Sequence, residues 1–334
     1  MQSIRTRSAV PVVAPERRAP EAVPLALASA GLLGLLVVVA PLSVVGAATR
    51  GVTFAATLVA VGVCVFARLA HDGAGAPEED GALRRAVVAT AVVGVVASFG
   101  WLAIDVVDIA GRGLAGITDS TSVHIVMRNG SYASAALRSL GLAVLAYVAL
   151  ARWRAITAGP LVAVGALMAC AWCMLTGHPA THGPTGIVHA MTFLHVAAAA
   201  VWFGGLVALG LVIRHRRGRG DLAGGAAIVH AFSRLMTWTV AGLLIGGTVM
   251  ALAFLGGIDR LTSTTYGLVL LAKIGLALSI LGVAGYNHRR LVPAVQAGDE
   301  RGWRMLGRTV AIEQLALIGV LALTAILVNL DPHS

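Results

Sequence analysis

Long runs of apolar residues alternate with short polar segments along nearly the whole chain. Each run approaches the roughly 20 residues with which a helix crosses the hydrocarbon core of a bilayer. The nine runs cover residues 24–47, 52–69, 86–107, 132–151, 160–176, 185–213, 232–256, 266–286 and 310–330. We therefore expect an all-α fold, a polytopic transmembrane bundle of about nine helices. The second helix should be short, and the sixth long enough to tilt or project.

The region before these helices has a different character. Residues 1–21 are rich in Arg and Pro and lack an apolar period, which predicts a disordered cytoplasmic tail and leaves 22–334 as a single transmembrane domain. The first run has a second interpretation, because a basic start, an apolar core and the small residues Gly46, Ala47 and Ala48 are typical of a signal peptide. Its core is longer than the usual 7–15 or so residues, which favours a retained helix. Cleavage would leave eight helices in the same orientation.

The arginines predict that orientation, because cytoplasmic loops carry an excess of positive charge. With the N-terminus inside, the cytoplasmic segments hold Arg5, Arg7, Arg17, Arg18, Arg68, Arg84, Arg85, Arg152, Arg154, Arg214, Arg216, Arg217, Arg219, Arg234, Arg289, Arg290, Arg301, Arg304 and Arg308. The other face keeps only Arg50, Arg112, Arg128, Arg260 and, near a helix start, Arg138. The expected topology is N-terminus in and C-terminus out.

Composition supports a membrane protein and removes several other classes. Hydrophobic residues make up 58% of the chain and charged residues 12%, whereas soluble domains carry roughly 25% charged residues. The formal charge of +10 lies in short loops, which favours a lipid bilayer and not nucleic acid as the partner. The three cysteines fall within apolar runs and predict no disulfide framework. We find no phosphate-binding loop, dinucleotide fingerprint or hydrolase elbow, so we do not expect an enzyme.

Candidate chemistry gathers between Cys170 and Gly205, in the stretch CAWCMLTGHPATHGPTGIVHAMTFLHVAAAAVWFGG. His178 and His182 lie in a turn broken by Gly and Pro on the predicted outer face, where two imidazoles can close on one metal ion. His189 lies near the start of the following helix. His195 lies six residues deeper, which corresponds to about 9 Å along the axis and about 120° around it. This offset favours successive sites over joint chelation of one ion.

Soft ligands accompany these histidines. Cys173 and Met174 lie in the outer third of the fifth helix, and Met191 precedes His195 by one turn on the same face. Thiolate and thioether sulfur suit Cu(I), while imidazole suits either copper oxidation state. Simpler interpretations stay open: the cysteines line a helix contact, His195 bonds a neighbouring helix, and the outer pair lies in an exposed loop.

Other polar residues lie close to or within the apolar runs. Lys273 falls near the middle of the eighth helix, and Glu313 about one turn into the ninth, near water. Each needs a partner, a cavity or a route to the interface, and both a structural contact and proton coupling fit. On the outer side, Trp101, Asp105 and Asp108 share a helical face. The loop that follows them, through residue 130, is either an ordinary polar loop or a surface that collects cations.

At these residues the sequence resembles the copper resistance D (CopD/PcoD) family of bacterial inner-membrane proteins. The matching features are Gly177-His178, His195 seven residues before Trp202, Gly204-Gly205, Phe232-Ser233-Arg234, Thr265-Tyr266-Gly267, Lys273, Asn287, Arg289-Arg290, Pro293 and Glu313. The N-terminal half matches in helix layout and in Arg138. The resemblance implies a multi-pass protein of the inner membrane that moves copper, commonly inward, alongside a periplasmic CopC-like carrier. We expect that carrier to be a separate protein.

The combined prediction is copper transport, with capture at His178 and His182, passage by His189 and His195, and Met174, Cys173 and Met191 as auxiliary ligands. One rival is a membrane electron carrier that binds haem b through two axial histidines. The other apolar runs hold no histidine at the depth of His195, although Met can also ligate haem. A second rival is a copper-delivery factor that assembles an oxidase.

Overall fold

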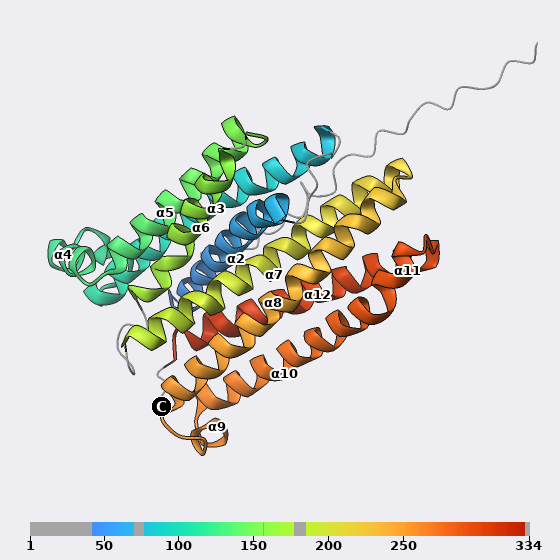
Figure 1. Ribbon diagram of the computed structural model, residues 1–334. Helices are drawn as coiled ribbons and strands as arrows, with labels where there is room; N and C mark the ends of the chain where they lie inside the picture. The colour runs from blue at the N-terminus through green and yellow to red at the C-terminus, as the bar shows by residue number, and fades with distance from the viewer. Residues whose placement is uncertain (1–41, 70–76, 156, 177–184, 331–334) are drawn as a thin grey trace, which may run out of the picture. The chain divides into compact units, whose positions relative to one another are not determined.

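The computed structural model describes residues 42–69, 77–155, 157–176 and 185–330, and its regular elements in these ranges are all helical. The α-helices are α2 (Leu42–Leu69), α3 (Pro77–Ala110), α4 (Ser120–Arg128), α5 (Ser131–Tyr147), α6 (Ala158–Ala171), α7 (Thr185–Arg219), α8 (Leu222–Leu255), α9 (Arg260–Ser263), α10 (Thr265–Tyr286), α11 (Val292–Gln296) and α12 (Glu300–Leu327) (Figure 1). Short 3-10 helices are η1 (Gly113–Thr118) and η3 (Trp172–Met174), and π-helical turns are η2 (Val148–Arg152) and η5 (Asn287–Leu291).

Seven helices in the described ranges are long and apolar enough to cross a membrane, and the shorter apolar helix over Ala158–Met174 joins them. They coincide with the second to ninth predicted runs, so the expectation of a polytopic helical bundle is confirmed. Most of the first predicted run and the whole predicted tail lie outside the described residues. The predicted number of helices and the membrane orientation stay predictions.

Several helices extend well beyond the apolar runs that predicted them. The second predicted helix is not short, because α2 spans 28 residues and includes Arg50. The predicted loop between residues 213 and 232 shrinks to Gly220 and Asp221, where the Asp221 side chain accepts a hydrogen bond from the Gly224 amide. The prediction was wrong there because hydropathy detects only the part of a helix that lies in lipid, whereas its polar ends continue into water.

The predicted loop after α3 also contains structure, since η1 and α4 occupy most of it. Asp119 caps α4 by accepting hydrogen bonds from the amide and the hydroxyl of Ser122, at 2.9 and 2.7 Å. These donors, followed by the Arg112 guanidinium, hold the pKa of Asp119 below its usual value. The Asp119 cap therefore fixes where α4 begins, and this segment is helical where an irregular loop was one expectation.

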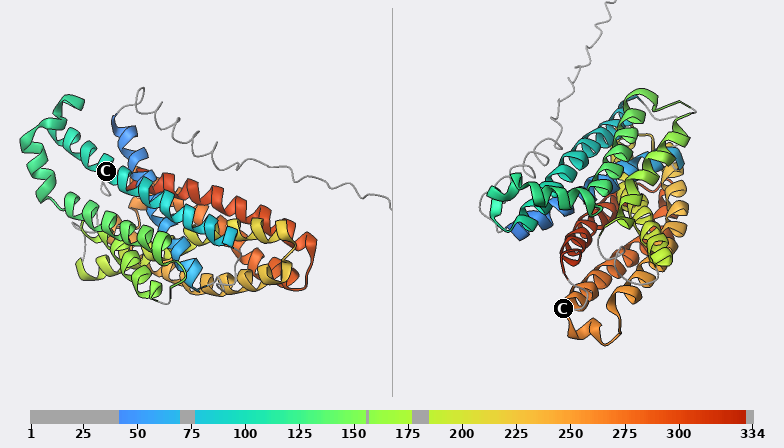
Figure 2. Two further views of the ribbon diagram at one scale, coloured as in Figure 1. Left: turned by 90° about the horizontal axis from the view of Figure 1, so that it is seen from above. Right: turned by 90° about the vertical axis from the view of Figure 1, so that its left-hand side faces the viewer.

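Helices α2 and α7 lie side by side at the centre, with α5 and α6 on one side and α10 and α12 on the other (Figures 1 and 2). Elements α4 and α9 lie at one end of the bundle, which we call the α4/α9 end, and α11 lies at the opposite α11 end. Arg216, Arg217 and Arg219 lie in the last turn of α7 and Arg289 and Arg290 in η5, all toward the α11 end. The α11 end is the arginine-rich one and corresponds to the predicted cytoplasmic face.

The contact between α2 and α7 depends on two glycines. A Cβ atom added to Gly62 would lie 2.0 Å from the Ala200 carbonyl oxygen, and one added to Gly204 would lie 2.7 Å from the Gly62 Cα. Small residues permit such close approach of backbones in membrane bundles, where dispersion contacts replace the hydrophobic effect as the driving force. This crossing fixes the helix that carries His189 and His195.

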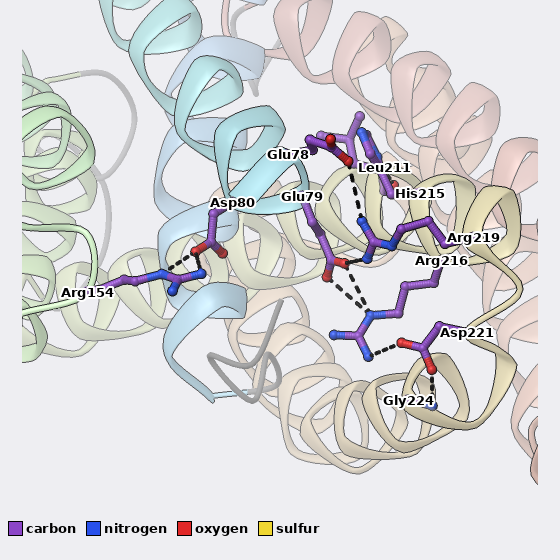
Figure 3. Close-up of polar contacts among 10 residues, drawn as sticks. All are labelled: Glu78, Glu79, Asp80, Arg154, Leu211, His215, Arg216, Arg219, Asp221 and Gly224. Atoms are coloured by element: carbon purple, nitrogen blue, oxygen red, sulfur yellow. Dashed lines mark hydrogen bonds and ion pairs between the residues drawn. The ribbon is translucent and has the colours of Figure 1, made fainter. Parts of the chain in front are cut away.

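Buried ion pairs join three helices at the α11 end (Figure 3). Glu79 of α3, 1% exposed, bonds Arg216 Nε at 3.2 Å and Arg219 Nη2 at 3.0 Å, both from α7. Arg216 Nη1 also bonds Asp221, the residue that caps α8, at 3.1 Å. Beside them Asp80 pairs with Arg154. The cluster ties the end of α7 to the starts of α3 and α8.

Arg138 is also deeply buried, although the sequence places it near a helix start on the outer face. It lies two turns into α5 with 1% exposure, and its Nε donates to Ser98 Oγ at 2.8 Å. Its guanidinium carbon lies 4.5 Å from the ring centre of Trp172 and 5.1 Å from that of Trp101. Stacking on two indole rings replaces part of the lost hydration.

Candidate functional site

His195 lies in α7 where this helix packs on α8. Its Nδ1 is 3.0 Å from the Leu243 carbonyl oxygen. A carbonyl can only accept, so Nδ1 carries the proton and Nε2 keeps its lone pair. Metal-binding histidines are usually held in this way, with one ring nitrogen bonded to a backbone carbonyl and the other free for the ion.

Two glycines of α8 make room for the ring. A Cβ atom added to Gly247 would lie 3.0 Å from His195 Cε1, and one added to Gly246 would lie 2.7 Å from the Met191 carbonyl oxygen. Gly242 and Gly246, four residues apart, thus form a small-residue face of α8 that packs on α7. Met191 and His195 lie together on the side of α7 that contacts α8.

The positive charge of Lys273 in α10 repels positive charge at the His195 imidazole. Lys273 is half-buried and forms no hydrogen bond or ion pair within the described part of the chain. A positive charge near the ring weakens the binding of any cation to it. The His195 position is therefore suited to weak binding and release.

His189 lies one turn into α7, on a different face from His195. Its Nε2 is buried and has no hydrogen-bond partner among the described residues, and the same is true of Thr192 Oγ1 one turn further. A buried polar atom without a partner costs free energy that a bound cation can offset. His189 and His195 remain about 9 Å apart along the unbroken helix, as predicted.

The predicted sulfur ligands do not all lie near His195. Met174 borders an apolar groove of about 410 Å³ that Ala190 and Phe193 of α7 also line. These two residues point about 140–160° away from His195 around the helix axis, so Met174 lies on nearly the opposite side of α7. The Cys173 thiol is buried and donates to the Cys170 carbonyl oxygen at 2.9 Å. Met191 shares the side of His195, whereas Met174 does not.

His178 and His182 lie outside the described residues. Within the described ranges, no group of three or more His, Cys, Asp or Glu side chains is close enough to hold a metal ion. At the α4/α9 end, Asp105 accepts from Trp101 Nε1 at 3.1 Å and pairs with Arg50 at 3.3 Å. The Asp105 carboxylate thus already has an indole and a guanidinium as partners, while Asp108 on the same helical face is exposed.

The sequence interpretation missed a polar cluster deeper in the bundle. Glu313 is 3% exposed and accepts hydrogen bonds from Asn287 Nδ2, at 2.5 Å, and from the Trp202 side chain. The prediction that Glu313 lies one turn into its helix and close to water was wrong, because α12 begins at Glu300 and this part of it is covered. The sequence did contain a signal for this cluster. Its members Trp202, Asn287 and Glu313 are all among the residues that match the copper resistance D family.

Comparison with known proteins identifies the family. The family model for copper resistance protein D matches residues 226–327, and that for the copper resistance protein D-like N-terminal domain matches residues 41–187. Together they cover about three-quarters of the chain, and the chain belongs to the copper resistance D family. Of the candidate residues, His189, His195 and Met191 lie in α7, which begins in the range matched by the N-terminal model.

Two curated relatives agree with this assignment. Copper resistance protein D of Pseudomonas syringae pv. tomato is 30% identical over 178 residues, 50% of this chain and 56% of that protein. Copper transport protein CutJ of Bacillus subtilis (strain 168) is 32% identical over 113 residues, 34% of this chain and 21% of that protein. The chain thus spans about half of the first relative and about a fifth of the second. No solved structure matches.

Proposed function

We propose that this protein moves copper across the bacterial inner membrane along α7, from the α4/α9 end toward the α11 end. The names of the two relatives, one for resistance and one for transport, support copper as the cargo. The observation that carries the proposal is His195, which is held by a backbone carbonyl at Nδ1 and whose Nε2 has no hydrogen-bond partner among the described residues.

His178 and His182 capture the ion at the outer face, where a separate CopC-like carrier delivers it. His189 forms the next level and His195 the one below, with Met191 as a soft ligand beside His195. Met174 belongs to the upper level, because it lies on the other side of α7 from His195, and Cys173 precedes it in the same short helix. Each level supplies few ligands, and a path needs sites that bind weakly enough to release the ion.

Copper stoichiometry and an absorption spectrum of purified protein test the proposal. His195→Ala should lose bound copper relative to wild type. His215→Ala is the matched control, because His215 lies in the same helix with its Nδ1 bonded to the Leu211 carbonyl at 2.8 Å, but near the α11 end (Figure 3).

Equal copper content in wild type and His195→Ala would remove His195 from the path. A haem absorption band without bound copper would favour the electron carrier. Unchanged cellular copper with lost oxidase activity on deletion of the gene would favour the delivery factor.

A further inference from the structure

The Glu313 cluster lies on the same side of α7 as His195. Trp202 follows His195 by seven residues, which is two turns of helix and about 10 Å toward the α11 end. Trp202 donates to Glu313, and Gln314 Nε2 donates to the Leu206 carbonyl at 2.9 Å, so α12 is bonded to α7 at this level. The carboxyl group therefore lies beyond His195 in the proposed direction of movement.

Glu313 has neutral hydrogen-bond donors but no positive partner. Within the described chain it forms no ion pair, and its bonded neighbours are an indole and an amide. Asn287 donates its Nδ2 to Glu313, and its Oδ1 is buried without a partner at a residue only 7% exposed. Two oxygen acceptors are thus buried together, and a buried carboxylate is costly unless a positive charge compensates it.

The charged groups on the elements packed against α12 do not compensate Glu313. Lys273 of α10 is half-buried and forms no ion pair in the described chain, Arg68 of α2 stacks on Trp153, and His288 of η5 bonds Ser233 Oγ at 2.7 Å. Arg289, Arg290 and Tyr286, and Arg214 and Arg217 of α7, are exposed. Arg216 and Arg219 of α7 pair with Glu79, His215 bonds the Leu211 carbonyl, and Arg50 of α2 pairs with Asp105. None of them forms an ion pair with Glu313 in the described chain.

The backbone at Asn287 is unusual. Asn287 begins η5, a π-helical turn inserted between α10 and α11. Such turns inside α-helices are rare and occur frequently at functional sites, because they displace a side chain from the regular helical position. Here the displaced residue is the one that contacts Glu313.

We propose that Glu313 and Asn287 form a binding site for a small monovalent cation, either a proton or Na⁺, which compensates the buried carboxylate. The cation binds between the level of His195 and the α11 end and is exchanged as copper passes. Only this role in transport rests on the proposed function, and the binding of the cation does not depend on it.

Infrared spectroscopy of the full chain in lipid nanodiscs tests the site without copper. A carboxyl signal that disappears in Glu313→Gln belongs to Glu313, and the exposed Glu300 of the same helix provides the control variant Glu300→Gln. If the proton is the occupant, wild type shows a protonated carboxyl band that is lost as pH rises and is insensitive to sodium. If Na⁺ is the occupant, the carboxylate bands shift when sodium replaces choline at constant pH.

A Glu313 signal that stays ionised and identical across pH and in both salts would overturn the site. Asn287→Ala keeps the carboxyl group and should shift the pH or sodium transition, so the test does not depend on Glu313→Gln folding. Copper flux in proteoliposomes separates the two proposals. Absent flux in wild type with a cation-sensitive Glu313 would refute transport alone, and flux with unchanged pH and sodium dependence in Glu313→Gln would refute the coupling.

Discussion

The ion pairs at the α11 end predict a large loss of stability on a nearly isosteric change. Glu79→Gln removes the negative charge between Arg216 and Arg219 but keeps the shape of the side chain. Glu79 is 1% and Arg216 4% exposed, so the arginine cannot recover full hydration in the folded protein. Removing one partner of a buried ion pair typically costs about 3–5 kcal/mol, a large share of the roughly 5–15 kcal/mol that stabilises a typical domain.

Denaturant unfolding in detergent, followed by circular dichroism, measures this loss. Glu300→Gln is the control, because Glu300 pairs with Arg304 at 3.7 Å on the surface and such pairs contribute little. The double variant Glu79→Gln/Arg216→Gln should recover part of the loss, since it also removes the buried guanidinium charge that Glu79 balances. Equal stability of Glu79→Gln and Glu300→Gln would refute the assignment of this cluster as the joint between α3, α7 and α8.

Two further predictions concern helix packing and capping. Gly62→Leu should destabilise the fold by about 1–3 kcal/mol or more by forcing α2 from α7, whereas Gly275→Leu, with open space around its Cβ, should not; equal unfolding midpoints would contradict the close contact. The hydrogen bonds from Ser122 lower the pKa of Asp119, so the cap stabilises α4 above the unfolded value of about 3.9 and is lost as pH falls through the lower folded value. The protection of α4 amides against hydrogen exchange, relative to the intrinsic rate at each pH, should therefore fall in acid and in Asp119→Ala but not in Asp108→Ala, and unchanged protection in Asp119→Ala would argue against the cap.

Much of the fold was predictable because a bilayer imposes one dominant rule on sequence. Apolar runs of suitable length located the described membrane helices. Helix ends were not predictable in this way. The starts of α8 and α12 depend on Asp221 and Asp299 capping segments that are polar, and a hydropathy pattern interprets such segments as loops.

The candidate site was predictable in its residue types and only partly in its arrangement. The spacing of His189 and His195 follows from helix geometry alone, so the structure agrees with it. The separation of Met174 from His195 depends on which side of α7 each neighbouring helix packs. The contact of Glu313 with Asn287 joins residues 26 positions apart through a π-helical turn. Neither follows from local sequence.

Copper flux into proteoliposomes is the most direct test of the central claim, with His195→Ala beside His215→Ala and both variants shown to be folded. The account predicts that wild type and His215→Ala carry copper at similar rates and that His195→Ala loses nearly all copper-dependent accumulation. Wild-type flux in a folded His195→Ala protein would contradict a path along α7 through this histidine.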